Sequence, residues 1–540
     1  MGDKDIFAPG AFLKKFFHIE DRDKSTVLVA IFFTFIYLLL IRLQLIYGYN
    51  SSDDFVYLAF PEKLSQIFIE SGRFIPGLFA KLILALGGSP ISVGFILKII
   101  ELFVFSGFVI IFCYSIHRLA SKEINRKLFI ITAFIPASYP LLLDHYSFMT
   151  NAPARIFEYL LCLAYLSCTI KRNYVLSGVV VLLSAFNYEG GLSLSIIIAF
   201  SMLALEQIKR FDTGEKPQFQ KVFDFAMAGA LALVAYYLIR TVLFPFCWKL
   251  AYGAAFFPHT RDALRPLLSL PHSFIDYVLF TTRQFGNQPF SILPPGPLVL
   301  WGVLISFSVF TFSKIKSGKT LTVKSFLLYS AFFFGLFILS GNFYSIIFDT
   351  PALYARASDQ FGFTLAVFIL VCGGGLAKFP RAKTVLCAAS CWIAILYTLS
   401  SAKCVYDTKM YYDQEMLAAA IIVGNLSQLE SYVPGVTRVA IEGRRADERR
   451  SLFSSELHPF LTGGLDGRLT RYWSKLLLLD FVAGYPLQPA TDSEAETAKH
   501  YCTAKIAAAD RNPYFVGSVS KELAVVCLES YKEPKKSRRR

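Results

Sequence analysis

Eleven apolar stretches of about membrane length constrain the fold of this chain more than any other feature. A helix needs about 20 apolar residues to cross the hydrocarbon core of a bilayer. The stretches lie at roughly 26–47, 91–116, 128–143, 153–170, 174–188, 190–208, 222–244, 295–313, 325–347, 360–377 and 384–402. The third and fifth are short and would cross only with tilt or local thinning of the bilayer. We therefore expect a polytopic α-helical membrane protein with about eleven transmembrane helices.

The distribution of charge separates this membrane region from a C-terminal domain. Charged residues number 56 in the first 400 positions but 37 in the last 140, which is the density of an ordinary soluble domain. We expect a cytoplasmic segment over 1–25, a transmembrane domain over 26–402, an α/β domain over 403–531 and a basic tail over 532–540. The net charge of +15 sits mostly in short loops between apolar segments, so nucleic acid is not an expected partner.

The periodicity of the C-terminal region predicts its elements. Apolar spacing predicts helices over 413–432 and 472–479, and alternation predicts a strand over 437–442. Two β-rich runs, 515–519 and 523–528, read as a terminal hairpin.

Loop charges predict the orientation of the chain. With the N-terminus in the cytoplasm, the inner loops contain 22 Lys and Arg, whereas the longer outer loops before residue 400 contain eight. Eleven crossings then put the C-terminal domain outside the cytoplasm. Cys502 and Cys527 both fall in that domain, and we expect them to pair in an oxidising compartment.

Two long outer loops, 48–90 and 245–294, hold amphipathic stretches typical of helices that lie in the membrane interface. The first opens with Asp53 and Asp54 and continues to a Gly72-Arg73-Phe74-Ile75-Pro76 turn. An adjacent pair of carboxylates is often only a solvated helix boundary, but it can also supply a general base or hold a divalent cation. An arginine can grip a phosphate with two parallel hydrogen bonds.

Further polar residues fall at the same outer level, where we expect them to contribute to substrate binding. They are Asp144, His145, Arg155 with Glu158 one turn on, Glu189 in the tight hairpin Asn187-Tyr188-Glu189, Tyr354 and Arg356. Ionisable residues at membrane depth are costly and are functional by default, although each could be a structural ion pair. Lys98 and Glu101 read as such a pair at i,i+3, while Arg42 and Arg240 are expected to snorkel or to reach a lipid phosphate.

The Asp53-Asp54 pair after the first helix, the Gly72-Arg73-Phe74 turn and an outer Arg356 after Pro351 resemble the type II glucosyltransferase family of bacteriophage serotype conversion. That family belongs to the polytopic GT-C-type glycosyltransferases, and the resemblance covers the whole chain in outline. It implies a GT-C-like fold and transfer of glucose from a polyprenyl-phosphate donor to lipopolysaccharide O-antigen on the periplasmic side of the bacterial inner membrane. It also implies Asp53 and Asp54 as the acidic pair and Arg73 and Arg356 as the loop arginines; Glu189 rests on topology alone.

Three functions compete at this point. The first is inverting glycosyl transfer to a surface glycan, with Asp53 or Asp54 as general base and Arg73 and Arg356 on the donor phosphate; a Mg²⁺ or Mn²⁺ cofactor is left open. The second is a transporter or flippase of a lipid-linked or small anionic substrate, which predicts internal repeats and helices broken at the bilayer midplane. Gly373-Gly374-Gly375 is the main hint of a break, but it lies near the expected cytoplasmic end of its helix. The third is a non-catalytic assembly or receptor component.

Overall fold

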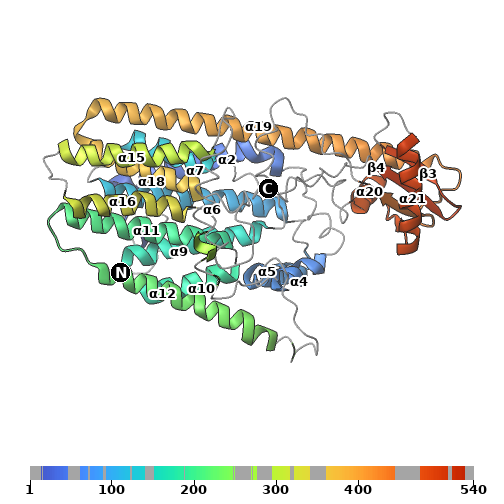
Figure 1. The fold of residues 1–540 in the computed structure, drawn as a ribbon, viewed down its shortest axis with the longest axis horizontal. Helices are drawn as coiled ribbons and strands as arrows, with labels where there is room; N and C mark the ends of the chain where they lie inside the picture. The colour runs from blue at the N-terminus through green and yellow to red at the C-terminus, as the bar shows by residue number, and fades with distance from the viewer. Residues whose placement is uncertain are drawn as a thin grey trace, which may run out of the picture. The chain divides into compact units, whose positions relative to one another are not determined.

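The computed structural model describes a largely helical chain (Figure 1). The described residues are 14, 16–46, 61–70, 73–88, 93–121, 125–139, 151–187, 189–246, 249, 269, 272–275, 295–316, 322–340, 360–443, 475–508 and 514–528. Two compact units emerge from the contacts within the chain. The helical unit includes Glu62–Tyr146 and Thr150–Lys403, and the C-terminal unit includes Cys404–Arg540.

Each of the eleven predicted apolar segments coincides with a helix. In chain order these are α2 (Asp21–Ile46), α6 (Gly94–Ala120), α7 (Arg126–Ser138), α9 (Ala152–Lys171), α10 (Tyr174–Asn187), α11 (Glu189–Asp212), α12 (Phe219–Leu238), α15 (Pro295–Lys316), α16 (Val323–Leu339), α18 (Gln360–Gly375) and α19 (Pro380–Ser427). Within the described residues, seven helices are long and apolar enough to cross a membrane: α2, α6, α9, α11, α12, α18 and α19. The polytopic class is therefore supported, while eleven crossings remain a prediction.

Helices α7, α10 and α16 are shorter than a membrane span, at 13, 14 and 17 residues. Two further short helices, α4 (Pro61–Glu70) and α5 (Phe74–Ala85), lie where the first outer loop was predicted to be amphipathic. On α5, Leu78 and Leu82 are exposed, whereas Pro76 and Ala80 are buried. The exposed leucines are consistent with contact between α5 and lipid.

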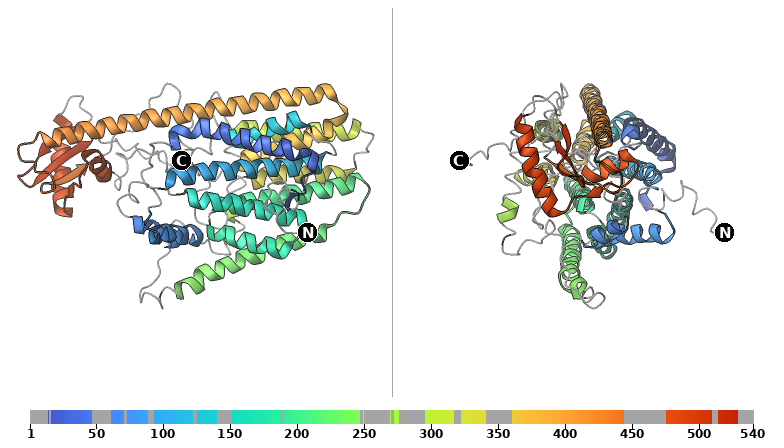
Figure 2. Two further views of the ribbon diagram at one scale, coloured as in Figure 1. Left: turned by 180° about the vertical axis from the view of Figure 1, so that it is seen from behind. Right: turned by 90° about the vertical axis from the view of Figure 1, so that its right-hand side faces the viewer.

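Long helices pack side by side in the helical unit, as Figure 1 and the reverse view in Figure 2 show for α6, α9 and α11. Rings from three helices fill the space between them: Phe105 and Phe108 of α6 contact Tyr159 of α9 and Phe363 of α18. Apolar packing of this kind fixes the relative positions of α6, α9 and α18.

The glycine run at the end of α18 permits close packing. A Cβ on Gly373 would collide with Leu128 of α7, one on Gly374 with the carbonyl oxygen of Ala120 at the end of α6, and one on Gly375 with Ser313 of α15. A single 3₁₀ turn, η7 (Leu376–Lys378), follows directly. The three glycines thus lie where α18 ends and where it approaches its neighbours most closely. The midplane break that a transporter would need is not found in α18.

The C-terminal unit contains a four-stranded sheet in the order β2-β1-β4-β3. Strand β1 (Arg438–Glu442) pairs in parallel with β2 (Gln488–Pro489) and with β4 (Leu523–Leu528), while β3 (Tyr514–Ser518) and β4 form an antiparallel pair. The predicted strand and terminal hairpin are confirmed, and the helix predicted over 472–479 is found as α20 (Lys475–Ala483). The helix predicted over 413–432 is the last part of α19.

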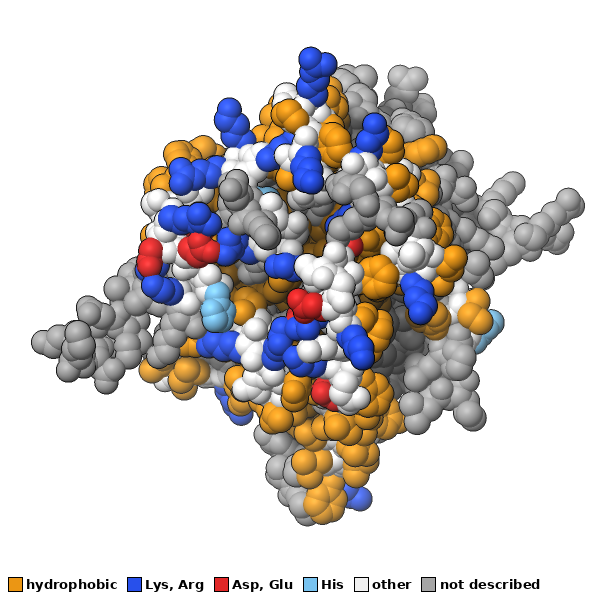
Figure 3. All heavy atoms as spheres, turned by 90° about the vertical axis from the view of Figure 1, so that its left-hand side faces the viewer, with side chains coloured by type: hydrophobic (Ala, Val, Ile, Leu, Met, Phe, Trp, Pro, Cys, Tyr) orange, Lys and Arg blue, Asp and Glu red, His pale blue; other side chains and the backbone are white. Residues whose placement is uncertain are grey.

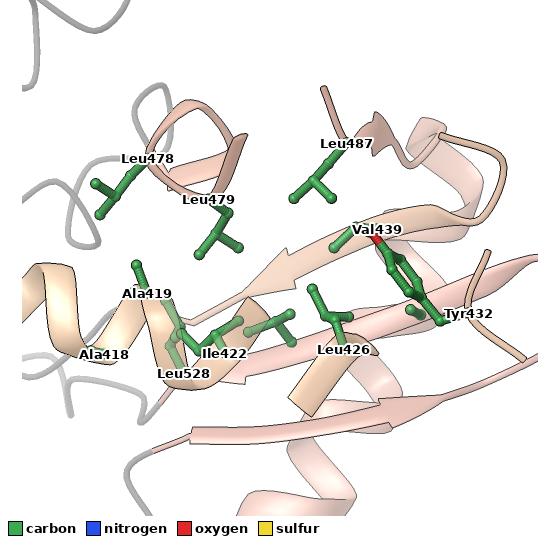
Figure 4. Packing of buried hydrophobic residues seen from close by; sticks show 12 residues of the cluster. Ala418, Ala419, Ile422, Leu426, Tyr432, Val439, Leu478, Leu479, Leu487 and Leu528 are labelled. Atoms are coloured by element: carbon green, nitrogen blue, oxygen red, sulfur yellow. The ribbon is translucent and has the colours of Figure 1, made fainter. Parts of the chain in front are cut away.

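Strand β4 is buried along its whole length because helices cover both faces of the sheet. Figure 4 shows one face, where Ile422 and Leu426 of α19 and Leu479 of α20 pack against Val439 and Leu528. On the other face, the helix α21 (Asp492–Ala508) packs against the alternate residues, and its Cys502 forms a disulfide with Cys527 of β4. The predicted disulfide is therefore confirmed.

Candidate functional site

The predicted site residues divide by whether the structure describes them. Asp53, Asp54, Asp144, His145, Tyr354 and Arg356 lie outside the described residues. Glu189 begins helix α11, but its side chain is outside the described set. Arg73 and Arg155 are described, and both belong to the helical unit.

Arg155 and Glu158 form a buried ion pair in the first two turns of α9. In the first two turns of α6, Lys98 donates to Glu101 over 2.9 Å, and both side chains are fully buried. Arg155 is also close enough to Glu101 to interact with it electrostatically. The two pairs therefore form one cluster, and the i,i+3 pairing predicted for Lys98 and Glu101 is confirmed.

The hairpin between α10 and α11 closes this cluster. Asn187, the last residue of α10, is buried, and its Nδ2 donates to the carbonyl oxygen of Ala154 over 2.7 Å. A Cβ on Gly191 of α11 would lie 3.0 Å from Cγ of Glu158, so a glycine there leaves room for the carboxylate. The expectation that 187–189 makes a tight turn is correct, since α10 ends at Asn187 and α11 begins at Glu189.

Arg73 is at the N-cap of α5, directly before an aromatic contact. The ring of Phe74 lies 5.2 Å from that of Phe186 on α10 and 4.5 Å from that of Phe244. Phe186 in turn contacts Tyr236 of α12. This chain of rings brings the Arg73 turn to the end of α10, the end that also carries Asn187.

Arg240 lies on a single π-helical turn, η3 (Ile239–Leu243), that continues α12. Its guanidinium donates to Tyr236 Oη over 2.9 Å and is almost fully buried. Turns of this type recur at functional sites. Arg42, near the end of α2, is also completely buried. Snorkelling into solvent, the first of the two alternatives for Arg42 and Arg240, is therefore wrong, because both side chains are buried. Contact with a lipid phosphate, the second alternative, stays a prediction.

Charged residues are confined to the ends of the candidate spans. The apolar middles of all seven, for example 102–116 of α6 and 159–170 of α9, contain no Asp, Glu, Lys or Arg. We call the end with Lys98, Glu101, Arg155, Glu158 and Arg240 the buried-charge end. Every one of these residues lies within about two turns of a helix terminus.

The opposite end of the helical unit is basic, and we call it the basic end. Helices α6, α9, α11 and α15 finish there with Arg118, Lys171, Lys209, Arg210, Lys314 and Lys316 in their last turns. Figure 3 looks onto this end, where Lys and Arg side chains surround a few carboxylates. Most of these ion pairs, such as Arg210 with Glu206, remain partly exposed.

Sequence reasoning missed one polar residue at the buried-charge end. Gln360 is the first residue of α18, is fully buried, and neither amide atom has a hydrogen-bond partner among the described residues. Glu101 Oε1 is likewise without a partner in that part of the chain. A buried polar atom left unpaired costs about 1–3 kcal/mol. The signal that could have identified Gln360 is its position, a single amide that opens an otherwise apolar helix.

The buried-charge end brings together side-chain types that recognise phosphate and hydroxyl groups. Arginine binds phosphate through paired hydrogen bonds, and Oε1 of Glu101 can accept a hydrogen bond from a hydroxyl group. No group of three or more potential metal ligands occurs among the described residues, which do not include Asp53 or Asp54. Comparison of the chain with models of known protein families, with curated proteins and with solved structures finds no match.

Proposed function

We propose that the protein is a membrane glycosyltransferase that moves a sugar from a polyprenyl-phosphate donor to a surface polysaccharide. The observation that carries this proposal is the position of the buried charges. Lys98, Glu101, Arg155 and Glu158 lie near helix ends, and a lipid phosphate would meet these ends if the helices cross the bilayer. The resemblance of the Asp53-Asp54 and Gly72-Arg73-Phe74 motifs adds the reaction class.

The same position disfavours a transporter. Transporters place substrate and coupling ions near the bilayer midplane, between broken helices. The middles of the candidate spans here are free of acidic and basic residues, and the glycine run of α18 is at the helix end. A transporter or flippase of a lipid-linked or small anionic substrate remains the second candidate, since the buried arginines would also suit an anion.

In the proposed reaction, Asp53 or Asp54 takes the proton of the acceptor hydroxyl as its oxygen attacks the anomeric carbon. The bond from that carbon to the phosphate oxygen breaks, the configuration inverts, and the polyprenyl phosphate leaves with the electron pair. Arg73 and Arg356 stabilise the negative charge of the leaving phosphate. Substrate binding also involves Arg155, Glu189, Asp144, His145 and Tyr354. Whether a Mg²⁺ or Mn²⁺ ion binds at Asp53 and Asp54 is a question for experiment.

We place the protein in the bacterial inner membrane, with the basic end in the cytoplasm and the C-terminal unit in the periplasm. Two observations support this orientation. Lys and Arg gather at one end of the helical unit, as the positive-inside rule requires of a cytoplasmic end (Figure 3). The Cys502–Cys527 disulfide is stable in an oxidising compartment.

A transfer assay in membranes tests the proposal. Labelled polyprenyl-phosphate glucose and lipopolysaccharide are supplied to wild type and to Asp53→Asn, Asp54→Asn and Arg73→Ala. General base catalysis contributes about 10²–10⁴ in rate, so loss of the base should reduce transfer by that factor. Asp413→Asn is a matched control, because this exposed carboxylate is paired only with Lys409 on the same helix among the described residues.

Transfer by wild type and by Asp413→Asn, with loss of transfer in Asp53→Asn, in Asp54→Asn or in both, would support the glycosyltransferase. Absence of transfer with every polyprenyl-phosphate sugar tested, by wild type of normal abundance, would overturn it. Uptake or flipping of a lipid-linked sugar by the same membranes would then favour the transporter.

A further inference from the structure

The basic end contains a cavity of about 490 Å³ that the proposed reaction does not use. It opens between the N-terminal segment and the last turns of α6, α9 and α11. The volume falls in the range of about 300–1,000 Å³ that is typical of small-molecule sites. Its lining is partly apolar, with Phe17, Met202 and Leu203, and partly cationic.

Four cations line the cavity against two carboxylates. Arg118, Arg172, Lys209 and Arg210 provide the positive charge, and Glu206 and Glu215 the negative. Glu206 pairs with both Arg172 and Arg210, and Arg210 also contacts Glu215 over 3.2 Å. Arg118 pairs with Glu20 of the N-terminal segment. These pairs hold the three arginines in place, and Lys209 adds a positive charge that they do not balance. Lys209 makes no ion pair with any residue that the structure describes.

The N-terminal segment is fixed as one wall of this cavity. The carbonyl of Phe16 accepts from Ser167 Oγ over 3.1 Å, and the Lys171 ammonium lies 4.3 Å from the centre of the Phe16 ring. Phe17 and Ile19 are buried on either side of His18. Because its neighbours are anchored, His18 is presented to the cavity rather than free to move away from it.

The backbone at the cavity is strained. Within the described residues, the two non-glycine residues with positive φ are His18, at 53°, and Arg172, at 57°, and both line the cavity. A left-handed non-glycine residue costs roughly 1–3 kcal/mol, and such residues cluster at ligand sites. Arg172 in this conformation is the C-cap of α9, and its backbone N–H donates to the carbonyl oxygen of Thr169 over 3.2 Å.

We propose that this cavity binds a phosphate group, with Arg172 and Lys209 as its principal cations. The apolar part of the lining favours the phosphate of an anionic phospholipid headgroup, because Phe17, Met202 and Leu203 could contact the first carbons of its tails. A soluble phosphate ester shares the chemistry and is distinguished by experiment. Basic pockets between transmembrane helices on the cytoplasmic side are known binding places for acidic headgroups. This proposal does not depend on the glycosyltransferase activity.

The test uses the full-length protein purified in detergent. Native mass spectrometry counts bound lipid, and thermal unfolding measures stabilisation, with phosphatidylglycerol, phosphatidylcholine, glycerol 3-phosphate and inorganic phosphate as probes. We expect phosphatidylglycerol to bind and to raise Tm. Arg172→Gln with Lys209→Gln should weaken its binding by about tenfold or more, the loss expected from removing one or two charge-assisted hydrogen bonds.

Lys378→Gln with Arg381→Gln is the matched control, because it removes the same two residue types from exposed positions at the basic end that do not line the cavity. Lys209→Gln alone covers the case in which the double variant fails to fold, since it breaks no ion pair among the described residues. Equal binding by wild type and the cavity variants, or an equal loss in the control, would overturn the site. Binding of glycerol 3-phosphate as strong as that of phosphatidylglycerol would identify a soluble ligand instead of a lipid.

Discussion

The two ends of the helical unit contain the same kinds of charged side chain but differ in how deeply they bury them. At the buried-charge end, Lys98 with Glu101 and Arg155 with Glu158 are enclosed by protein. At the basic end, Glu206 with Arg172 and Arg210 remains partly in contact with solvent. Enclosure costs several kcal/mol per ion, whereas a solvated pair costs little. Buried charges that are kept despite this free-energy cost are therefore a stronger sign of function than charges at the surface.

The largest expected difference between the ends is their accessibility from outside the cell. In whole cells, Lys81→Cys on α5 should react with a membrane-impermeant maleimide, whereas Lys216→Cys, in the loop after α11, should react only after permeabilisation. Both positions are exposed in the protein, so the bilayer alone should separate them. The measurement is gel detection of the label against wild type. Reaction of Lys216→Cys in intact cells would reverse the orientation.

Removal of one partner of a buried pair should be the next largest effect. Glu101→Gln leaves the fully buried Lys98 without this carboxylate, and loss of one partner in a buried pair costs about 3–5 kcal/mol. We expect a large fall in Tm, measured by thermal unfolding of the detergent-solubilised protein. The double variant Lys98→Met with Glu101→Leu should recover much of the loss. A single variant as stable as wild type would show that the pair is solvated.

Close helix packing at the basic end should give the next largest effect. Gly374→Ala places a methyl group against the carbonyl oxygen of Ala120, so α6 and α18 must separate. Overpacking of this kind costs about 1–3 kcal/mol, against a gain of up to about 1 kcal/mol in helix propensity. Gly107→Ala is the control, because a Cβ there meets nothing within 4 Å and should be neutral or stabilising. Equal unfolding temperatures for both variants would exclude a close helix contact.

The smallest effect is expected from the partly exposed pairs. Glu206→Gln at the basic end removes the carboxylate shared by Arg172 and Arg210 and should cost less than about 1 kcal/mol. The loss should shrink further at high salt, since exposed charges are screened over about 10 Å at 0.1 M. Chemical or thermal unfolding at low and high ionic strength checks this. A loss as large as that for Glu101→Gln would remove the contrast between the two ends.

The sequence alone predicted the helices and the C-terminal strands because both depend on local apolar patterns. Alternation in 437–442 and the β-rich run 523–528 predicted the strands. Their parallel pairing was missed, because two segments more than 80 residues apart leave no local signal. The helix α21 was also missed. Its sequence is mostly polar, and the few small residues that contact the sheet, such as Ala498, make no clear apolar pattern. The disulfide was predicted because both cysteines fall in a domain expected in an oxidising compartment. The prediction did not say that it joins α21 to β4.

At the candidate site, the sequence determined which residue types gather near the helix ends, because hydropathy excludes charge from the middle of a span. Tertiary structure decided which of them are enclosed. Arg42 and Arg240 look like snorkelling side chains in sequence, but both are buried in the folded chain. The cavity at Arg172 and Lys209 also exists only in three dimensions, because it requires α6, α9, α11 and the N-terminal segment to end at the same place. Burial is a property of neighbours brought together by the fold, and no residue carries it in its own local sequence.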